Sequence, residues 1–275
     1  AYENIVYVKI PVDKDYQNMN IYIPEEYFNN SSIGSYNSNN APIFFPNTVG
    51  GYMPGKADTV GLGRDGKANS LTYALSKGYV VAAPGARGRT LTDDKGNYTG
   101  KAPAAIVDLK AAVRYLYLND EVMPGDANKI ISNGTSAGGA LSALLGATGN
   151  SSDYLPYLKE IGAADTRDDI FAVSAYCPIT NLENADSAYE WMYNGVNSYS
   201  RMEFTKNTSA QEYNDRSLTR STVQGSLSDE EIEISNKLKT LFPFYLNSLK
   251  LTDDAGNSLT LDKNGSWQGS FTGLN

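Results

Sequence analysis

The sequence has 275 residues, of which 41% are hydrophobic and 20% are charged, a composition typical of globular proteins that bury one substantial core. The net charge is −8 at pH 7 and the 23 Lys and Arg residues are scattered along the chain, so we expect no nucleic acid partner. Every apolar run in the sequence is much shorter than the ~20 residues of a membrane span, and we therefore expect no membrane partner.

Strand and helix patterns alternate through the first two thirds of the chain. The segments 4–12 and 19–28 alternate apolar and polar residues and run into proline, which predicts an entry hairpin. Apolar runs of the kind buried in a sheet centre follow at 41–47, 79–89, 129–134 and 170–178. Helices are predicted between them, over 67–78, 103–120 and 137–147. This alternation predicts an α/β fold with a mostly parallel sheet and helices on both faces.

The pattern changes after Pro178. We predict helices over 181–195 and 229–249, and we find no further buried strand in the polar stretch 195–225. The chain therefore divides into a core region, 1–180, and a second region, 181–275.

Two similar decapeptides begin at residues 91 and 251, with the sequences LTDDKGNYTG and LTDDAGNSLT. A calcium loop of the EF-hand type needs more ligands at fixed spacing. We therefore predict two Asp–Gly–Asn hairpin turns instead.

The segment KIISNGTSAGGALSALLGATG, residues 129–149, contains a Gly-x-Ser-x-Gly pattern centred on Ser136. The pattern alone has little specificity in a chain rich in Gly and Ser. Here a buried strand precedes it and a helix follows, and in that setting the tight turn strains the serine and exposes its hydroxyl group. Any side chain at Gly134 or Gly138 would strike the adjacent strand or helix. The sequence therefore predicts Ser136 as a nucleophile.

A nucleophilic serine of this kind needs two N–H donors to stabilise the oxyanion. The backbone N–H of Ala137, at the helix N-terminus, is the first predicted donor. The second is expected from the loop after the third strand, NTVGGYMPG, residues 47–55. We predict the amide of Gly50 or of Gly51.

Several segments together resemble the bacterial tannase-like serine carboxylesterases, also called subtype B tannases, which are α/β-hydrolases related to feruloyl esterases. These segments are PIFFPNTVGGYMPG, GARGR, DLKAAVRYLYLND, MPGDANKIISNGTSAGGALSALLGATGNS and DDIFAVSAYCPITNLENADSAYEW. The resemblance implies a nucleophile at Ser136, an oxyanion donor at Ala137, and a helical lid inserted after the sixth core strand, here within 181–275. It implies a small-molecule ester substrate, gallate-type first, with feruloyl, cinnamoyl or short-chain esters as alternatives. We expect no metal or cofactor, and a secreted or cell-surface location in a bacterium, with the cytoplasm as the alternative.

The sequence contains no histidine. In α/β-hydrolases the triad acid and histidine follow the nucleophile, on loops after the last strands. The resemblance places both beyond the point that matches Asn275. We therefore expect this chain to be the N-terminal part of a longer enzyme, whose C-terminal remainder supplies the acid, the histidine and the last strands of the sheet.

Other residues are weaker candidates for the triad acid, the base, or the lining of the site. Glu183 and Asp186 are alternative triad acids, with helix capping as the simpler interpretation. Lys56 and Lys101 are weaker alternatives for the base, because neither lies in an apolar run. Arg87 and Arg89 are predicted to pair with carboxylates such as Asp108, and Cys177 is predicted to be buried and unreactive. Four aromatic residues are candidates either for lining the substrate or for forming the core of the lid: Tyr154, Tyr189, Trp191 and Tyr193.

Two other classes of function are compatible with the same motif. A catalytically inactive α/β-hydrolase used as a binding module would explain the lack of histidine. A serine peptidase of the prolyl type shares the motif, but the β-propeller repeats of about 40 to 50 residues that would accompany it are not visible in this sequence.

Overall fold

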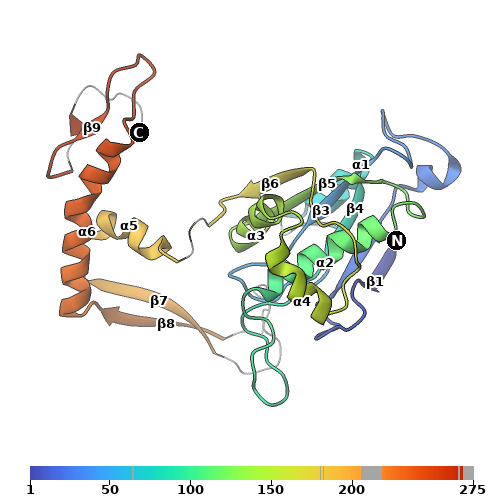
Figure 1. The fold of residues 1–275 in the computed structure, drawn as a ribbon, viewed down its shortest axis with the longest axis horizontal. Helices are drawn as coiled ribbons and strands as arrows, with labels where there is room; N and C mark the ends of the chain where they lie inside the picture. Colours follow the sequence, from blue (N-terminus) through green and yellow to red (C-terminus); the bar gives the residue numbers. More distant parts are fainter. Residues whose placement is uncertain (64, 180, 182, 206–218, 266, 269–275) are drawn as a thin grey trace. The chain divides into compact units, whose positions relative to one another are not determined.

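The computed structural model describes residues 1–63, 65–179, 181, 183–205, 219–265 and 267–268. These residues form two compact units (Figure 1). The first is Ala1–Ile179, and the second contains the described residues of Thr180–Thr205 and Thr219–Asn275.

The first unit is built on a sheet with the strand order β1-β2-β4-β3-β5-β6. β1 pairs with β2 and β2 pairs with β4 in the antiparallel sense, whereas β4, β3, β5 and β6 are parallel. The predicted entry hairpin and the mostly parallel sheet are therefore confirmed. The strand bounds are β1 Tyr2–Val6, β2 Asn18–Tyr22, β3 Pro42–Pro46, β4 Val80–Pro84, β5 Asp126–Thr135 and β6 Ala172–Tyr176.

The sequence of β4 explains why the centre of the sheet is buried on both faces. Val80 and Ala82 belong to the larger apolar core, while Val81 and Ala83 belong to a smaller core with Leu71. Side chains alternate between the two faces of a strand, so a strand covered on both faces needs apolar residues at every position. A continuous apolar run is therefore the expected signature of this strand.

Helices cover both faces of this sheet. On one face α2, Ala104–Leu118, buries Ile106, Leu109 and Leu116 in the larger core, together with α3, Ala137–Ala147. Figure 1 shows these two helices lying along the sheet. On the other face α1, Ser70–Ser76, packs Leu71 and Ala74 against Val81. The remaining helical segments are η1 Glu25–Asn29, η2 Ser152–Tyr154 and α4 Leu155–Glu160.

A buried ionic cluster ties α2 to the segment that precedes β6. Asp168 accepts a hydrogen bond from Lys110 Nζ at 2.8 Å and another from Arg114 Nε at 2.8 Å. Lys110 and Asp168 are fully buried, and Asn150 exchanges two hydrogen bonds with Asp168 through backbone N–H groups. Removing one partner of a buried pair leaves an uncompensated charge.

We predict that Asp168→Asn lowers the free energy of unfolding by about 3–5 kcal/mol, because Lys110 and Arg114 then lack their counter-charge. The neighbouring substitution Asp169→Asn is the matched control. Asp169 pairs with Arg167, whose side chain is half-exposed, so its loss should cost no more than about 1 kcal/mol. Urea unfolding of both variants measures the difference, and equal effects would contradict the prediction.

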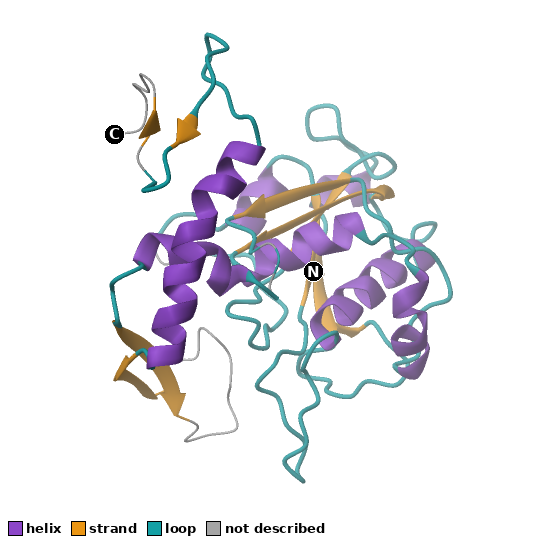
Figure 2. Cartoon of the chain, turned by 60° about the vertical axis from the view of Figure 1, so that its left-hand side comes forward, coloured by secondary structure: helices purple, strands orange, loops and turns teal. Residues whose placement is uncertain are grey.

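The second unit contains two helices and two short antiparallel ladders. β7 pairs with β8 from Ser198↔Ser226 to Thr205↔Thr219, a hairpin that the sequence analysis did not predict. The side chains described on these strands are mostly exposed. In the sequence, apolar and polar residues alternate only over 201–205, a stretch too short to predict a strand pair. Figure 2 shows the hairpin beside the start of α6. The bounds are α5 Ala185–Tyr193, β7 Ser198–Thr205, β8 Thr219–Ser226, α6 Asp229–Ser248, β9 Thr260–Leu261 and β10 Trp267–Gln268.

Packing between α5 and α6 gives the second unit an apolar contact of its own. The rings of Trp191 and Phe242 stack with their centroids 3.6 Å apart and their planes inclined by 7°. At the start of α6, Ser228 and Glu231 form a reciprocal capping box, which satisfies two backbone donors of the first turn. The predicted helices of this region are therefore confirmed.

The two similar decapeptides form equivalent turns. Asn97 N donates to Asp93 Oδ1 at 2.8 Å, and Asn257 N donates to Asp253 Oδ1 at the same distance. Each turn is closed by an antiparallel bridge, Thr92↔Tyr98 or Thr252↔Ser258. The predicted hairpin turns are confirmed.

The described residues offer neither a metal-binding cluster nor a membrane-spanning helix. They contain no group of three His, Cys, Asp or Glu side chains arranged to hold a metal ion. None of the helices in this part of the chain is both long and apolar enough to cross a membrane.

Candidate active site

Ser136 lies at the junction between β5 and α3. Its backbone angles are φ 57° and ψ −120°, in a region that non-glycine residues occupy only when the surrounding structure imposes it. Its N–H donates to Tyr176 O at the end of β6, at 2.9 Å, and the residue is exposed. The predicted sharp bend, with an exposed serine between strand and helix, is present in the structure.

Three glycines make this bend sterically feasible. A Cβ atom on Gly134 would lie 2.3 Å from Gly138 O, and one on Gly138 would lie 2.6 Å from Asn47 Oδ1. On Gly139 it would lie 2.5 Å from Tyr176 O. All three distances are shorter than any normal contact. A side chain at Gly134 or Gly139 would therefore push a strand and α3 apart, and one at Gly138 would displace the loop after β3.

We predict that Gly134→Ala destabilises the fold and abolishes any chemistry at Ser136, because its new methyl group meets the backbone of α3. Gly61→Ala is the matched control, since a Cβ there meets nothing within 4 Å. Overpacking of this kind costs about 1–3 kcal/mol or more. Thermal unfolding of the two variants measures this, and a Gly134→Ala melting temperature equal to that of the control would contradict the steric account.

The first turn of α3 presents Ala137, the predicted oxyanion donor. The N–H groups of the first helical residues have no acceptor within their own helix, and they lie at the positive end of the helix dipole. Ala137 is fully buried as a residue, which fixes its peptide group beside the exposed serine. The position agrees with the predicted role, and the donation itself stays a prediction.

Asn47 links the predicted oxyanion loop to the turn at Ser136. It follows β3 directly, and its Nδ2 lies within hydrogen-bond distance of Asn133 O at 3.2 Å, Gly138 O at 3.1 Å and Ser142 Oγ at 3.0 Å. Its Oδ1 accepts from Val49 N at 3.4 Å. The sequence analysis missed this residue, although a polar side chain directly after a buried strand is a signal of a functional edge.

We predict that Asn47→Asp weakens both stability and activity, because a carboxylate replaces a donor that faces three oxygen atoms. The cost should be about 1–3 kcal/mol in the free energy of unfolding. Asn39→Asp is the control, because exposed Asn39 uses its side-chain oxygen only as an acceptor, a role that aspartate retains. Equal unfolding midpoints for the two variants would show that Asn47 does not hold the loop.

Gly50 and Gly51 lie in a tight turn of the loop 47–55. Met53 N donates to Gly50 O at 3.0 Å, and Gly51 has a positive φ of 57°. Tyr52 also has a positive φ, 56°, and its hydroxyl is buried without a partner among the described residues. Burial raises the pKa of Tyr52 above its ordinary value. The loop conformation is therefore constrained, while the choice between Gly50 and Gly51 as donor stays a prediction.

Arg87 and Arg89 bind different partners in the structure. Arg87 forms the predicted pair with buried Asp108, through Nε and Nη2. Burial alone would lower the pKa of Arg87, but the hydrogen bonds and charge of Asp108 raise it. Arg89 instead donates Nε–H to Gly51 O at 2.8 Å, so the predicted carboxylate pairing is wrong for Arg89 among the described residues.

The predicted burial of Cys177 is also wrong, because this thiol is exposed. Within the described residues β6 is the edge strand of the sheet, and Cys177 follows its last residue with a positive φ of 46°. The apolar run therefore resembles a central strand although one side of it is uncovered.

The alternative acids and bases lie in exposed or undescribed positions. Lys56 and Lys101 are exposed, and Lys101 Nζ lies 4.0 Å from the centroid of the Tyr98 ring. Neither has the buried environment that a lysine base requires. Glu183 is exposed, and the side chain of Asp186 lies outside the described residues.

The aromatic candidates for substrate lining occupy different environments. Tyr154 packs against the core of the first unit, with Lys110 Nζ 4.8 Å from its ring centroid. In the second unit Trp191 stacks on Phe242, whereas Tyr189 and Tyr193 are largely exposed. Their roles toward a substrate stay predictions.

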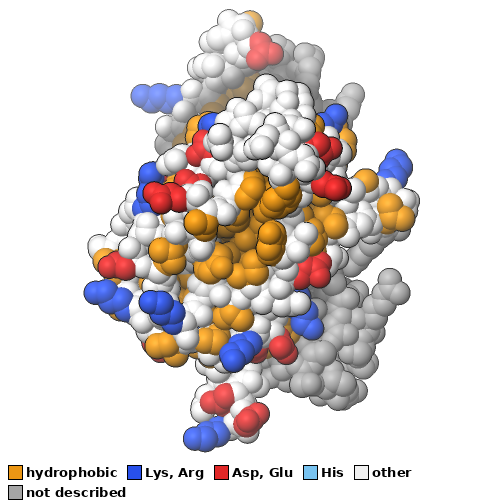
Figure 3. Space-filling view, turned by 90° about the vertical axis from the view of Figure 1, so that its right-hand side faces the viewer, with side chains coloured by type: hydrophobic (Ala, Val, Ile, Leu, Met, Phe, Trp, Pro, Cys, Tyr) orange, Lys and Arg blue, Asp and Glu red, His pale blue; other side chains and the backbone are white. Residues whose placement is uncertain are grey.

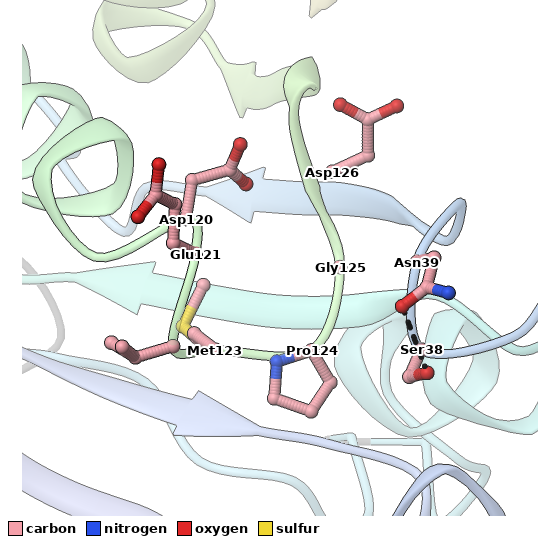
Figure 4. A pocket seen from close by; sticks show the side chains of 9 residues that line it. Ser38, Asn39, Asp120, Glu121, Met123, Pro124, Gly125 and Asp126 are labelled. Atoms are coloured by element: carbon pink, nitrogen blue, oxygen red, sulfur yellow. Dashed lines mark hydrogen bonds between the residues drawn. The ribbon is translucent and has the colours of Figure 1, made fainter. Parts of the chain in front are cut away.

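A pocket of about 420 Å³ lies at the other end of β5 from Ser136 (Figure 4). Ser38, Asp120 and Asp126 line it. Asp120 accepts from Ala127 N and Asp126 pairs with Lys129, so these carboxylates hold the loop before β5. Ligands of parallel α/β sheets bind at the carboxyl ends of the strands, where Ser136 lies, and this pocket is therefore not the candidate active site.

An apolar hollow of about 220 Å³ lies beside the opposite edge strand. It is lined by Ile5 of β1, Ile23, Phe28 and residues near the end of α2. Figure 3 shows hydrophobic side chains gathered on the side of the molecule where β1 lies. In the strand order β1 and β6 are at opposite edges, so this hollow too is separate from Ser136.

The strand order, the parallel pairing of β3 to β6 and the strained serine between β5 and α3 together define an α/β-hydrolase fold. The chain belongs to the BD-FAE family, whose model matches residues 50–235. No curated protein matched the sequence.

Three solved structures illustrate the similarity. The Fusobacterium nucleatum tannase is 92% identical, with a TM-score of 0.82 and coverage of 96% of this chain and 55% of that chain. A Lactobacillus plantarum tannase is 49% identical, with a TM-score of 0.79 and coverage of 96% and 56%. A tannin acyl hydrolase in complex with ethyl gallate is 48% identical, with a TM-score of 0.77 and coverage of 96% and 54%. The resemblance to tannases is confirmed, and this chain spans about half the length of those structures.

Proposed function

We propose that this chain is the nucleophile-bearing part of a serine esterase that hydrolyses carboxylic esters of aromatic acids. The observation that carries the proposal is the exposed Ser136 with its imposed positive φ at the start of α3. Membership in the BD-FAE family and the similarity to tannases support the reaction class.

In the proposed reaction, Ser136 Oγ attacks the ester carbonyl carbon while a base removes its proton. The N–H groups of Ala137 and of Gly50 or Gly51 stabilise the oxyanion. The alcohol leaves with a proton from the same base, and water then releases the acid from the acyl-enzyme.

The base and its carboxylate partner are proposed to come from the C-terminal remainder of the same polypeptide. Two observations support this. The sequence contains no histidine, and the tannase chains that it matches are nearly twice as long. The remainder would also extend the sheet beyond β6, whose Tyr176 is 58% exposed.

Gallate esters are the proposed substrates. Tannin acyl hydrolases that are 48% identical to this chain bind ethyl gallate and 3,4-dihydroxybenzoate in their solved complexes. Feruloyl, cinnamoyl and short-chain esters are the alternatives within the same reaction class. Of the four aromatic candidates for substrate lining, Tyr189 has the most exposed ring, at 64%, followed by Tyr193 at 57%. Trp191 and Tyr154 already pack against Phe242 and Lys110.

We predict that a fluorophosphonate probe labels Ser136 in the longer protein that carries this sequence. Mass spectrometry of the labelled peptide locates the adduct. Ser136→Ala should abolish labelling and lower kcat/KM for methyl gallate by about 10⁴-fold or more, because the nucleophile is lost. Ser38→Ala, which removes a hydroxyl from the distant pocket of Figure 4, should change neither.

Parallel assays with methyl ferulate and p-nitrophenyl acetate rank the alternative substrates. A protein that is folded but neither labels nor hydrolyses any of the three esters would support the inactive binding module instead.

A further inference from the structure

The segment 86–89 lies beside the predicted oxyanion loop and bonds to it repeatedly. Gly55 and Ala86 exchange two backbone hydrogen bonds, of 3.0 and 2.8 Å. Arg89 then adds two more, from its N–H to Tyr52 O at 2.7 Å and from its Nε–H to Gly51 O at 2.8 Å. A Cβ on Gly88 would lie 2.2 Å from Met53 C, so the two backbones are in close contact.

These bonds fix the direction of the amides in the loop. The C=O and N–H groups of one trans peptide unit point in opposite directions. Met53 N–H holds Gly50 O, which sets the direction of the Gly51 N–H, and Arg89 holds the carbonyls of both Gly51 and Tyr52. Gly51 and Tyr52 have φ of 57° and 56°, a conformation that a tyrosine keeps only when its surroundings impose it.

The backbone that carries Arg89 is itself anchored. Two residues earlier, Arg87 binds fully buried Asp108 through its side chain and through its backbone N–H at 2.9 Å. Tyr7 donates its hydroxyl to Gly85 O at 2.9 Å, and burial, reinforced by the charge of Asp108, raises the pKa of Tyr7 well above its ordinary value. Arg89 thus extends from a fixed segment, while its own side chain is exposed.

We propose that Arg89 is a positioning residue for the second oxyanion donor of the loop 47–55. Its side chain holds the Gly51–Tyr52 peptide unit, and its N–H holds the Tyr52 carbonyl. This orients the Met53 N–H, which binds Gly50 O and so sets the direction of the Gly51 N–H. This inference rests on the proposed esterase function of Ser136. An oxyanion hole acts mainly in the transition state, so a misaimed donor lowers kcat far more than it changes KM.

The test uses the longer protein with Arg89→Ala, Arg89→Lys and the control Lys95→Ala, whose exposed side chain lies on the nearby turn. The concentration of reactive Ser136 is first titrated with the fluorophosphonate, so that kcat refers to folded, competent sites only. We expect Arg89→Ala to lower this kcat for methyl gallate by about tenfold to 100-fold, since removing a donor outright costs about 10²–10³. KM should change by less than about threefold.

A second measurement distinguishes a misdirected oxyanion donor from a general disturbance of the fold. The affinity of phenylboronic acid, whose adduct with serine places an oxygen in the oxyanion hole, should fall in parallel with kcat, while the dissociation constant of gallate stays unchanged. Arg89→Lys, which offers a donor without the planar fork, should recover part of the loss, and Lys95→Ala should match the wild-type protein.

A titrated kcat for Arg89→Ala equal to that of the wild-type protein would overturn the proposal, and so would equal losses of boronate and gallate affinity. A wild-type protein that hydrolyses none of the esters would instead refute the proposed function of Ser136. The two failures are therefore distinguishable.

Discussion

The backbone bend at Ser136 is the constraint on which the rest of the site depends. Its angles of 57° and −120° cost about 1–3 kcal/mol and persist only where neighbouring structure over-determines them. Here the Ser136 N–H binds Tyr176 O on β6, α3 begins at the next residue, and glycines at 134, 138 and 139 leave room for the backbones to meet. The packing of strand and helix therefore offsets the strain and holds the hydroxyl at the carboxyl edge of the sheet.

Polar residues on α2 extend this constraint to the surrounding loops. Asp108 fixes Arg87 and with it the segment that holds the loop 47–55, while Lys110 and Arg114 bind Asp168 before β6. Buried ion pairs contribute little net stability compared with apolar packing. Their value here is geometric, because they hold irregular segments in fixed positions relative to the sheet.

The sequence predicted the mostly parallel sheet and the sharp, exposed bend at Ser136 because both depend on local patterns. Apolar runs mark the buried strands β3 to β5, and the small residues around Ser136 are required by one tight turn. The misses depend on tertiary context. Cys177 lies in an apolar run at an edge of the sheet that is uncovered in the described part of the chain. Among the same residues Arg89 binds a carbonyl rather than a carboxylate, and Asn47 acts through partners 86 to 95 residues away. The described side chains of β7 and β8 are mostly exposed, and the two strands carry only a short apolar alternation, at 201–205.

The most direct test is a crystal structure of the longer protein after reaction with an aryl phosphonate. The account predicts a covalent bond from Ser136 Oγ to phosphorus, with the phosphoryl oxygen within about 3 Å of Ala137 N and of Gly50 N or Gly51 N. An adduct on another residue, or a phosphoryl oxygen directed away from both the α3 N-terminus and the loop 47–55, would contradict it.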